Sequence, residues 1–343
     1  MAQYRHHLPQ LSNDIFLTDG GLETTLIFLE GLNLPDFAAF DLLRHPAGYQ
    51  SLQKYFRTYA NLAQTYQVGL ILESATWRAS SDWGTKLGYS PAILAEMNRR
   101  AIALLHSIRQ EYETEQCRIV ISGCVGPRGD GYVPAEVMTV NAAENYHRNQ
   151  IAIFRDADAD LVTAITMNYV QEAIGITRAA QSLGMPVVIS FTVETNGKLP
   201  TGQPLSEAIA QVDAATDSGP AYYMINCAHP THFADVLADG GSWLERIRGI
   251  RANASVKSHA ELNESDTLDE GNPEEFGSQY RELRQQFPHF TVLGGCCGTD
   301  DRHIKAICQA CLPVLGSHLL SGKRLINSEP IYFMPSANYS NPA

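Results

Sequence analysis

Eight short apolar segments are distributed along this chain, and longer amphipathic segments lie between them. The apolar segments are residues 15–18, 68–74, 118–123, 160–166, 186–193, 222–227, 248–254 and 290–295. Their hydrophobicity is continuous rather than alternating, which is typical of parallel strands that are covered on both faces. The clearest amphipathic segments are residues 91–115, 137–157, 170–183, 204–217, 273–287 and 301–314.

This alternation predicts an α/β protein with the (β/α)8 TIM barrel fold. An open, doubly wound sheet would show the same alternation, but no glycine-rich dinucleotide-binding motif follows the first apolar segment. We therefore expect a single domain over residues 1–343, with the barrel at about 14–312 and a C-terminal tail at 313–343.

Composition and charge exclude several functional classes. The net charge of the chain is −12, whereas nucleic-acid recognition needs a basic surface, so we expect no nucleic-acid partner. No segment approaches the roughly 20 apolar residues of a membrane span, so we expect no membrane partner. The amino terminus lacks the apolar core of a signal peptide, which predicts a cytoplasmic protein. In that reducing compartment, cysteines are more often metal ligands or nucleophiles than disulfides. The oligomeric state stays open.

Three cysteines stand where two predicted strands end, and a barrel of this kind carries its chemistry at the carboxyl ends of its strands. Cys227 closes the sixth apolar segment, and Cys296 and Cys297 follow the eighth. Three soft thiolate ligands with a fourth position open are typical of a catalytic zinc site. The alternative is three buried thiols that only pack as small hydrophobic groups. The placement at two strand ends favours the zinc site.

Other potential ligands fit less well. His229 and His232 follow Cys227 in CAHPTHF, but Pro230 interrupts this segment, and we expect both histidines to cap or line a helix. We do not expect metal binding from the remaining cysteines, which are Cys117, Cys124, Cys308 and Cys311.

Four motifs resemble, in chain order, landmarks of the homocysteine S-methyltransferase family. They are TDGGLETTL (18–26), GCVGPRG (123–129), INCAHP (225–230) and LGGCCGTDDRHI (293–304). The resemblance spans about residues 14–312 and implies a zinc-dependent (β/α)8 barrel. The three cysteine ligands of the family correspond to Cys227, Cys296 and Cys297. The implied partners are a small thiol acceptor and a cationic methyl donor, such as betaine or S-methylmethionine.

The resemblance also implies roles in substrate binding. Asp19 corresponds to the residue that holds the amino group of homocysteine, and Gly20 and Gly21 let the backbone approach the substrate closely. Asn226 precedes the first cysteine ligand as it does in relatives. Asn253 resembles an asparagine at the end of the seventh strand.

This chain also departs from the family pattern. Ile165 stands where relatives commonly carry a glutamate that helps to grip the amino acid. Glu23, Glu73 and Glu194 are carboxylates near strand ends that are not typical of the family, and we expect them to face the donor cation or the acceptor ammonium. Surface salt bridging is the alternative for each of them. Trp77 is expected to contact the donor through a cation–π interaction, and the alternative is packing in the barrel wall.

The expected reaction is methyl transfer from a sulfonium or quaternary ammonium donor to homocysteine or selenohomocysteine, giving methionine. A thiol that coordinates zinc is deprotonated and nucleophilic, and a departing sulfide or tertiary amine needs no proton. Two alternatives stay open: a methyltransferase for a different small thiol, and a non-catalytic zinc- or thiol-binding barrel. A zinc hydrolase is disfavoured, because hydrolytic barrels usually use histidine and carboxylate ligands.

Overall fold

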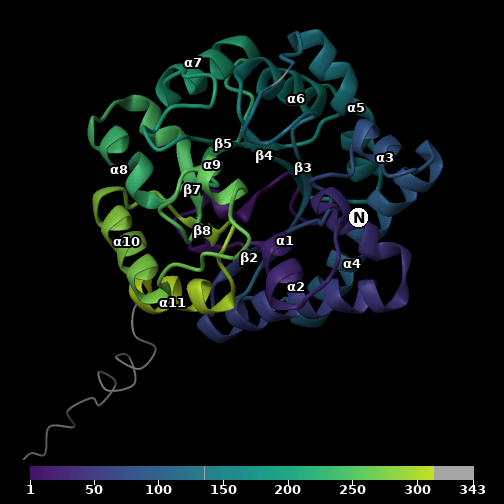
Figure 1. The fold of residues 1–343 in the computed structure, drawn as a ribbon, viewed down its shortest axis with the longest axis horizontal. Coiled ribbons are helices and arrows are strands. Elements are labelled where there is room, and N and C mark those ends of the chain that lie inside the picture. The colour runs from purple at the N-terminus through teal and green to yellow at the C-terminus, as the bar shows by residue number, and fades with distance from the viewer. Residues whose placement is uncertain (135, 313–343) are drawn as a thin grey trace, which may run out of the picture. The chain divides into compact units, whose positions relative to one another are not determined.

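The computed structural model describes residues 1–134 and 136–312. Within them, eight parallel strands form a closed barrel, in which each strand pairs with the next and β8 pairs with β1 (Figure 1). The strands are β1 (Phe16–Leu17), β2 (Gly69–Glu73), β3 (Ile119–Val125), β4 (Leu161–Met167), β5 (Val187–Thr192), β6 (Tyr222–Asn226), β7 (Ile247–Ala252) and β8 (Val292–Gly295). The predicted (β/α)8 TIM barrel is confirmed.

Helices surround the barrel. They are α1 (Leu22–Thr24), α2 (Pro46–Tyr66), α3 (Ser81–Lys86), α4 (Pro91–Tyr112), α5 (Val140–Asp156), α6 (Val170–Ser182), α7 (Leu205–Thr216), α8 (Pro230–Ala238), α9 (His259–Asn263), α10 (Pro273–Gln286) and α11 (Asp301–Cys311). Proline occupies the first turn of α2, α4, α8 and α10. Proline fits there because the first turn of a helix needs no N–H donor.

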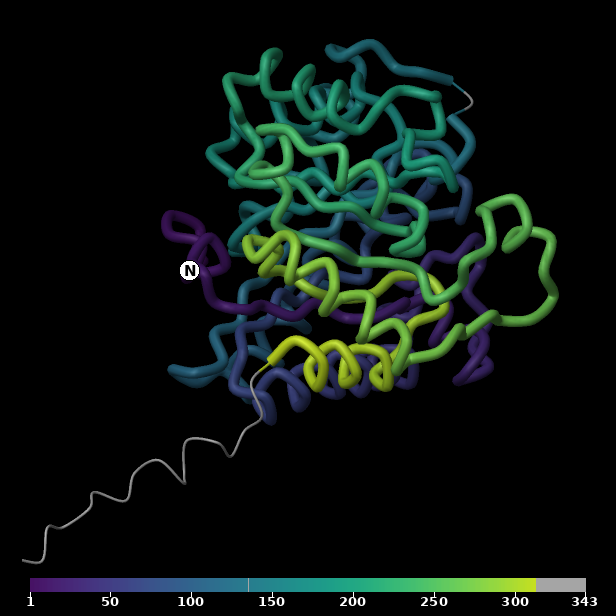
Figure 2. The backbone as a smooth tube through the Cα atoms, turned by 90° about the vertical axis from the view of Figure 1, so that its left-hand side faces the viewer, coloured from purple at the N-terminus to yellow at the C-terminus, as the bar shows by residue number. Residues whose placement is uncertain are grey.

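The interior of the barrel is a packed hydrophobic core. Its side chains come from the strands, and Leu8 from the amino-terminal segment joins them. The buried strand residues of this cluster are Phe16, Ile71, Val120, Leu161, Val188, Tyr222, Met224 and Val292. The amino terminus lies at one end of the barrel, and the light-green segment between β7 and α10 projects at the other end (Figure 2).

Residues 1–312 form one compact unit. The tail that we expect at 313–343 lies outside the described residues. Among the helices of the described residues, none combines the length and the apolar character that a membrane span requires.

Candidate metal centre

Three cysteine sulfur atoms meet at the carboxyl ends of β6 and β8. The Sγ atoms of Cys227, Cys296 and Cys297 all lie within 4.8 Å of one another. Those of Cys227 and Cys296 are in bonding contact, as in a disulfide, and their Cα atoms are 5.4 Å apart. Three sulfur donors at one point fit a soft tetrahedral metal such as zinc and leave one position for another ligand. Binding a metal requires all three as thiolates.

The backbone after β6 and β8 turns sharply and directs these side chains toward one another. Cys227 has a φ angle of +53° and Gly298 a φ angle of +80°. The N–H of Cys227 donates a hydrogen bond of 3.1 Å to the carbonyl of Arg251. The carbonyl of Cys296 accepts from the N–H of Thr299 at 3.1 Å and from its hydroxyl at 2.7 Å. We call residues 296–299 the cysteine turn.

Gly20 and Gly21 pack directly against the cysteine turn. A Cβ atom at Gly21 would lie 2.6 Å from the carbonyl oxygen of Cys296, and one at Gly20 would lie 2.9 Å from that of Thr299. The N–H of Gly21 also donates to the Thr299 carbonyl at 2.9 Å. The sequence predicted that these glycines let the backbone approach a substrate. In the structure, the group that approaches them is the protein's own cysteine turn.

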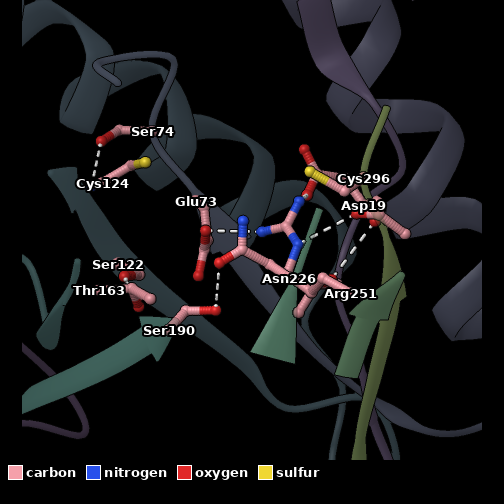
Figure 3. Close-up of polar contacts among 12 residues, drawn as sticks. Asp19, Glu73, Ser74, Ser122, Cys124, Thr163, Ser190, Asn226, Arg251 and Cys296 are labelled. Atoms are coloured by element: carbon pink, nitrogen blue, oxygen red, sulfur yellow. Dashed lines mark hydrogen bonds and ion pairs between the residues drawn. The ribbon is translucent and has the colours of Figure 1, made fainter. Parts of the chain in front are cut away.

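Arg251 of β7 lies between two buried carboxylates (Figure 3). Its Nη1 donates to Oε2 of Glu73 at 2.6 Å, and its Nη2 donates to Oδ1 of Asp19 at 2.5 Å. The hydroxyl of Tyr55 donates to the other oxygen of Asp19 at 3.2 Å. The two carboxylates that the sequence assigned to a substrate cation are therefore already opposed by a cation of the protein. Sequence reasoning missed Arg251, although a charged residue inside an apolar strand segment is an unusual signal.

Burial shifts the titration of these acidic groups. It raises the pKa of Glu73 to about 7, although the charge of Arg251 lowers it. Burial likewise raises the pKa of Glu23 to about 7, and the neighbouring Asp19 raises it further. Burial lowers the pKa of Arg251, but Asp19 and Glu73 raise it more, so the guanidinium stays charged. Near neutral pH, the site therefore contains carboxyl groups that are partly protonated.

The side-chain amide of Asn226 is engaged with neighbouring strands. Its Oδ1 accepts from the N–H of Thr166 at 3.0 Å and from the hydroxyl of Ser190 at 2.6 Å, and its Nδ2 donates to the Thr166 hydroxyl at 3.0 Å. Thr166 has a φ angle of +64°, at the point where the pairing of β4 with β5 shifts in register. Asn226, predicted to bind substrate, thus stabilises this irregular backbone. Ile165, which precedes Thr166, is buried.

His259 and Tyr132 lie beside the cysteines. Nε2 of His259 donates to the carbonyl of Cys227 at 2.5 Å, and Nδ1 lies 3.2 Å from Oε1 of Glu194. The imidazole stacks on the ring of Tyr132 with centroids 4.2 Å apart. The hydroxyl of Tyr132 is 3.8 Å from Sγ of Cys297. The sequence placed Glu194 near a substrate, whereas the structure places it against His259, which sequence reasoning did not identify.

Asn253 offers an unused hydrogen-bond acceptor beside the first cysteine. It lines a narrow cavity together with Cys227, Glu194, Lys257 and His259. Its side chain is buried, and its Oδ1 accepts no hydrogen bond from the described residues. The cavity is too narrow for a water molecule, so a donor group would reach this acceptor only if the neighbouring side chains moved.

The ring of Trp77 already carries a cation of the protein. The guanidinium carbon of Arg78 lies 3.9 Å from the centroid of the Trp77 ring. The sequence predicted a donor cation at this ring. In the structure, Arg78 occupies one face of the ring. The doubtful histidine ligand His229 caps α8, where its side chain accepts from the N–H of Thr231.

Comparisons with known proteins agree on one family. The family model described as homocysteine S-methyltransferase matches residues 16–311. The chain is 22% identical over 259 residues to homocysteine S-methyltransferase 4 of Zea mays, which covers 70% of this chain and 75% of that protein. It is 23% identical over 346 residues to methionine synthase of Mycobacterium leprae (strain TN), which covers 94% of this chain and 26% of that protein.

Solved structures with the same fold include those of the homocysteine methyltransferase MmuM from Escherichia coli. Its metallated form matches with a TM-score of 0.65 at 19% identity and covers 86% of this chain and 96% of that chain. Its oxidized form matches with a TM-score of 0.65 at 17% identity, over 88% and 97% of the two chains.

Proposed function

Since this chain belongs to the homocysteine S-methyltransferase family and is a methyltransferase, we propose the following reaction for it. It moves a methyl group from a sulfonium or quaternary ammonium donor to homocysteine or selenohomocysteine, giving methionine or selenomethionine. The metal is zinc, and its ligands are Cys227, Cys296 and Cys297. The observation that most supports this proposal is the convergence of the three sulfur atoms within 4.8 Å at the ends of β6 and β8.

The cysteines define where the acceptor sulfur reacts. When bound by these three thiolates, zinc would act as a Lewis acid that keeps an incoming thiol deprotonated. The thiolate of the acceptor attacks the methyl carbon in line, so the new S–C bond forms while the bond to the sulfonium or ammonium atom breaks. The electron pair of that bond leaves with a neutral sulfide or amine. Because this leaving group takes no proton, the chain needs no general acid.

The surrounding residues orient and shield the reactants. The stacked rings of Tyr132 and His259 lie beside Cys297 and Cys227 and exclude water from that side. Asp19 and Glu73 share the single guanidinium of Arg251, so this group carries a net negative charge when both are ionised, which favours a cationic donor. Holding both reactants in line supplies much of the rate enhancement.

The proposal is tested by following a labelled acceptor. Zinc-loaded protein is incubated with homocysteine that carries deuterium on its carbon chain and with unlabelled S-methylmethionine, S-adenosylmethionine or betaine. We expect mass-shifted methionine from at least one donor. Because the label is on the acceptor, it separates new methionine from the unlabelled methionine that S-methylmethionine itself leaves behind. If the three donors give no labelled product above that of a Cys297→Ser control, the proposed reaction is wrong.

A different small thiol is the second candidate acceptor. Ile165 replaces the glutamate expected from relatives, and Asp19 is paired with Arg251, so part of the expected grip on an ammonium group is absent. Methylation of simple thiols in the same assay, with homocysteine no better, would favour this candidate. Zinc binding without methylation of any thiol would favour a non-catalytic barrel.

A further inference from the structure

Arg78 is a buried cation that lacks an anionic partner. Its side chain follows β2 and is only 7% exposed. The guanidinium carbon lies 3.9 Å from the ring centroids of both Trp77 and Trp83, so the group is sandwiched between the two indoles. Nη1 donates to the carbonyl of Gly129 at 2.9 Å, but Nε is buried without a partner. Among the described residues, no carboxylate oxygen lies within 4.0 Å of Arg78, the limit for an ion pair.

The other buried arginines of the described residues are paired. Arg109 contacts Asp160 at 2.7 Å, and Arg251 contacts two carboxylates. Burying a charged group is costly unless an opposite charge and hydrogen bonds compensate. Burial accordingly lowers the pKa of Arg78. An anion from outside the chain would remove this imbalance.

One loop connects Arg78 to the metal centre. Gly129, which accepts its hydrogen bond, lies in the loop that carries Tyr132, and the Tyr132 hydroxyl is 3.8 Å from the sulfur of Cys297. Burial raises the pKa of Glu23, and the charges of Arg251 and Arg78 lower it, which places Arg78 within electrostatic reach of the acidic groups. The anion would therefore bind at the same end of the barrel as the thiol.

The free edge of the guanidinium fits a carboxylate. With Nη1 engaged, the Nε–Nη2 edge is the one that can donate two parallel hydrogen bonds, which is the geometry that carboxylates match. Two positions expected to bind an ammonium group provide no free negative charge, because Asp19 is paired with Arg251 and Ile165 is uncharged. Locally, around Arg78, the group without an ion-pair partner is thus the cation, because the charges of Asp130, Glu23 and Asp36 raise its pKa without forming an ion pair with it.

We propose that Arg78 binds the carboxylate of an amino-acid substrate, so that this charge, rather than the ammonium, is the main handle by which the site recognises it. The inference rests on the proposed function, in which both homocysteine and S-methylmethionine carry such a carboxylate. Arg78 acts by binding and orienting the substrate and takes no part in the bond changes.

The acceptor is tested with matched analogues. The thiols are homocysteine, γ-mercaptobutyrate, which lacks the amino group, and mercaptopropylamine, which lacks the carboxylate. We compare wild type, Arg78→Met and Arg78→Lys, with Arg128→Met as the control. Arg128 lies beside Gly129 on the loop after β3, but it is exposed and pairs with Asp82, so its loss removes one positive charge without touching the site.

We expect Arg78→Met to raise the Michaelis constants of the two carboxylate-bearing thiols by roughly ten- to a hundredfold, the range that charged hydrogen bonds supply. The constant for mercaptopropylamine should not change, and Arg78→Lys should recover part of the loss. Arg128→Met should resemble wild type for all three thiols. Zinc content and circular dichroism identify a variant that has merely failed to fold. If Arg78→Met fails to fold, the same comparison is made with Arg78→Lys, which should raise the Michaelis constants of the two carboxylate-bearing thiols and leave that of mercaptopropylamine unchanged.

The donor is tested in the same way, with S-methylmethionine against trimethylsulfonium, which has no carboxylate. A loss confined to S-methylmethionine assigns the carboxylate to the donor, and a loss confined to the thiols assigns it to the acceptor. Equal changes for analogues with and without a carboxylate, or no change for any of them, overturn the proposal.

The test also separates this inference from the proposed function. If wild type methylates no thiol, the proposed function fails, and calorimetric binding of the three thiols to the zinc-loaded proteins then tests Arg78. Tighter binding of γ-mercaptobutyrate than of mercaptopropylamine, lost in Arg78→Met, supports the inference. Binding that does not depend on the carboxylate, or no binding of any of the three, overturns it.

Discussion

Tyr132 and His259 stack across the mouth of the barrel, with ring centroids 4.2 Å apart. Tyr132 lies in the loop after β3 and His259 begins α9 after β7, so the two residues come from opposite sides of an eight-stranded barrel. The loop that carries Tyr132 is anchored from β4, because Nδ2 of Asn168 donates to the carbonyls of Asp130 at 2.9 Å and Gly131 at 3.0 Å. The stack is therefore a fixed bridge beside the cysteines.

Replacing Tyr132 by phenylalanine should weaken zinc binding while the ring stack persists. Burial raises the pKa of Cys297, and the hydrogen bond from the Tyr132 hydroxyl lowers it, so the hydroxyl favours the thiolate that a metal needs. Loss of such an outer hydrogen bond typically costs about ten- to a hundredfold in metal affinity. Competition with a chelator measures the change. Tyr4→Phe, at the other end of the barrel, is the control, and equal affinities in both variants would contradict the prediction.

Replacing Cys297 by serine should remove zinc and activity together, because a hydroxyl is a poor ligand for a soft metal. Metal analysis of the purified protein should give about one zinc for wild type and much less for the variant. Cys308→Ser is the matched control, since Cys308 is a buried cysteine of α11 outside the cluster. A Cys297→Ser protein with full zinc content would exclude Cys297 as a ligand.

Replacing Arg251 by methionine should destabilise the fold strongly at neutral pH, because it leaves Asp19 and Glu73 buried without a cation. The expected loss in the free energy of unfolding is about 3–5 kcal/mol, as for other broken buried ion pairs. Arg57→Met, which breaks the exposed pair with Glu111, should lose only about 0.2–1 kcal/mol.

The loss in Arg251→Met should be smaller at pH 5, where the two carboxyl groups can be protonated and no longer leave an uncompensated charge. Urea unfolding at both pH values measures this. An equal loss at the two pH values would show that packing rather than charge is responsible.

Replacing Glu23 by glutamine should change how stability depends on pH. Burial raises the pKa of this carboxyl from 4.5 to about 7. Between pH 4.5 and about 7, the carboxyl is therefore protonated in the folded state and ionised in the unfolded state. The stability of wild type relative to the variant is therefore greatest below about pH 4.5 and falls as pH rises through about 7. Denaturant unfolding of both proteins at pH 5 and pH 8 checks the sign. A difference that stays constant, or that grows with pH, would contradict it.

The fold was predictable because each strand corresponds to a continuous apolar segment of the sequence. The continuous apolar segment at 118–123 predicted β3, which the structure extends to Val125. Five helices of the described residues, α1, α2, α3, α8 and α9, lie outside the amphipathic segments named from the sequence. The longest of them, α2, buries Leu52, Tyr55, Phe56 and Tyr59 at helical spacing. That signal was present in the sequence and was not used.

The charge relationships of the site were not predictable, because they join residues that are distant along the chain. Arg251 meets Asp19 across 232 residues and Glu73 across 178, and no local pattern specifies these pairs. The carboxylates themselves were identified from their places at strand ends. The residue that opposes Asp19 and Glu73 was not identified, and the contact of these two carboxylates with a substrate cation stays a prediction.

Closure of the barrel joins distant parts of the chain at one site. The three sulfur atoms belong to residues 227–297, in the second half, whereas Asp19, Glu73, Arg78 and Tyr132 belong to the first half. Pairing of β8 with β1 brings the two parts face to face. A substitution that opens this pairing would separate the sulfur atoms from Asp19, so the site exists only while the barrel is closed.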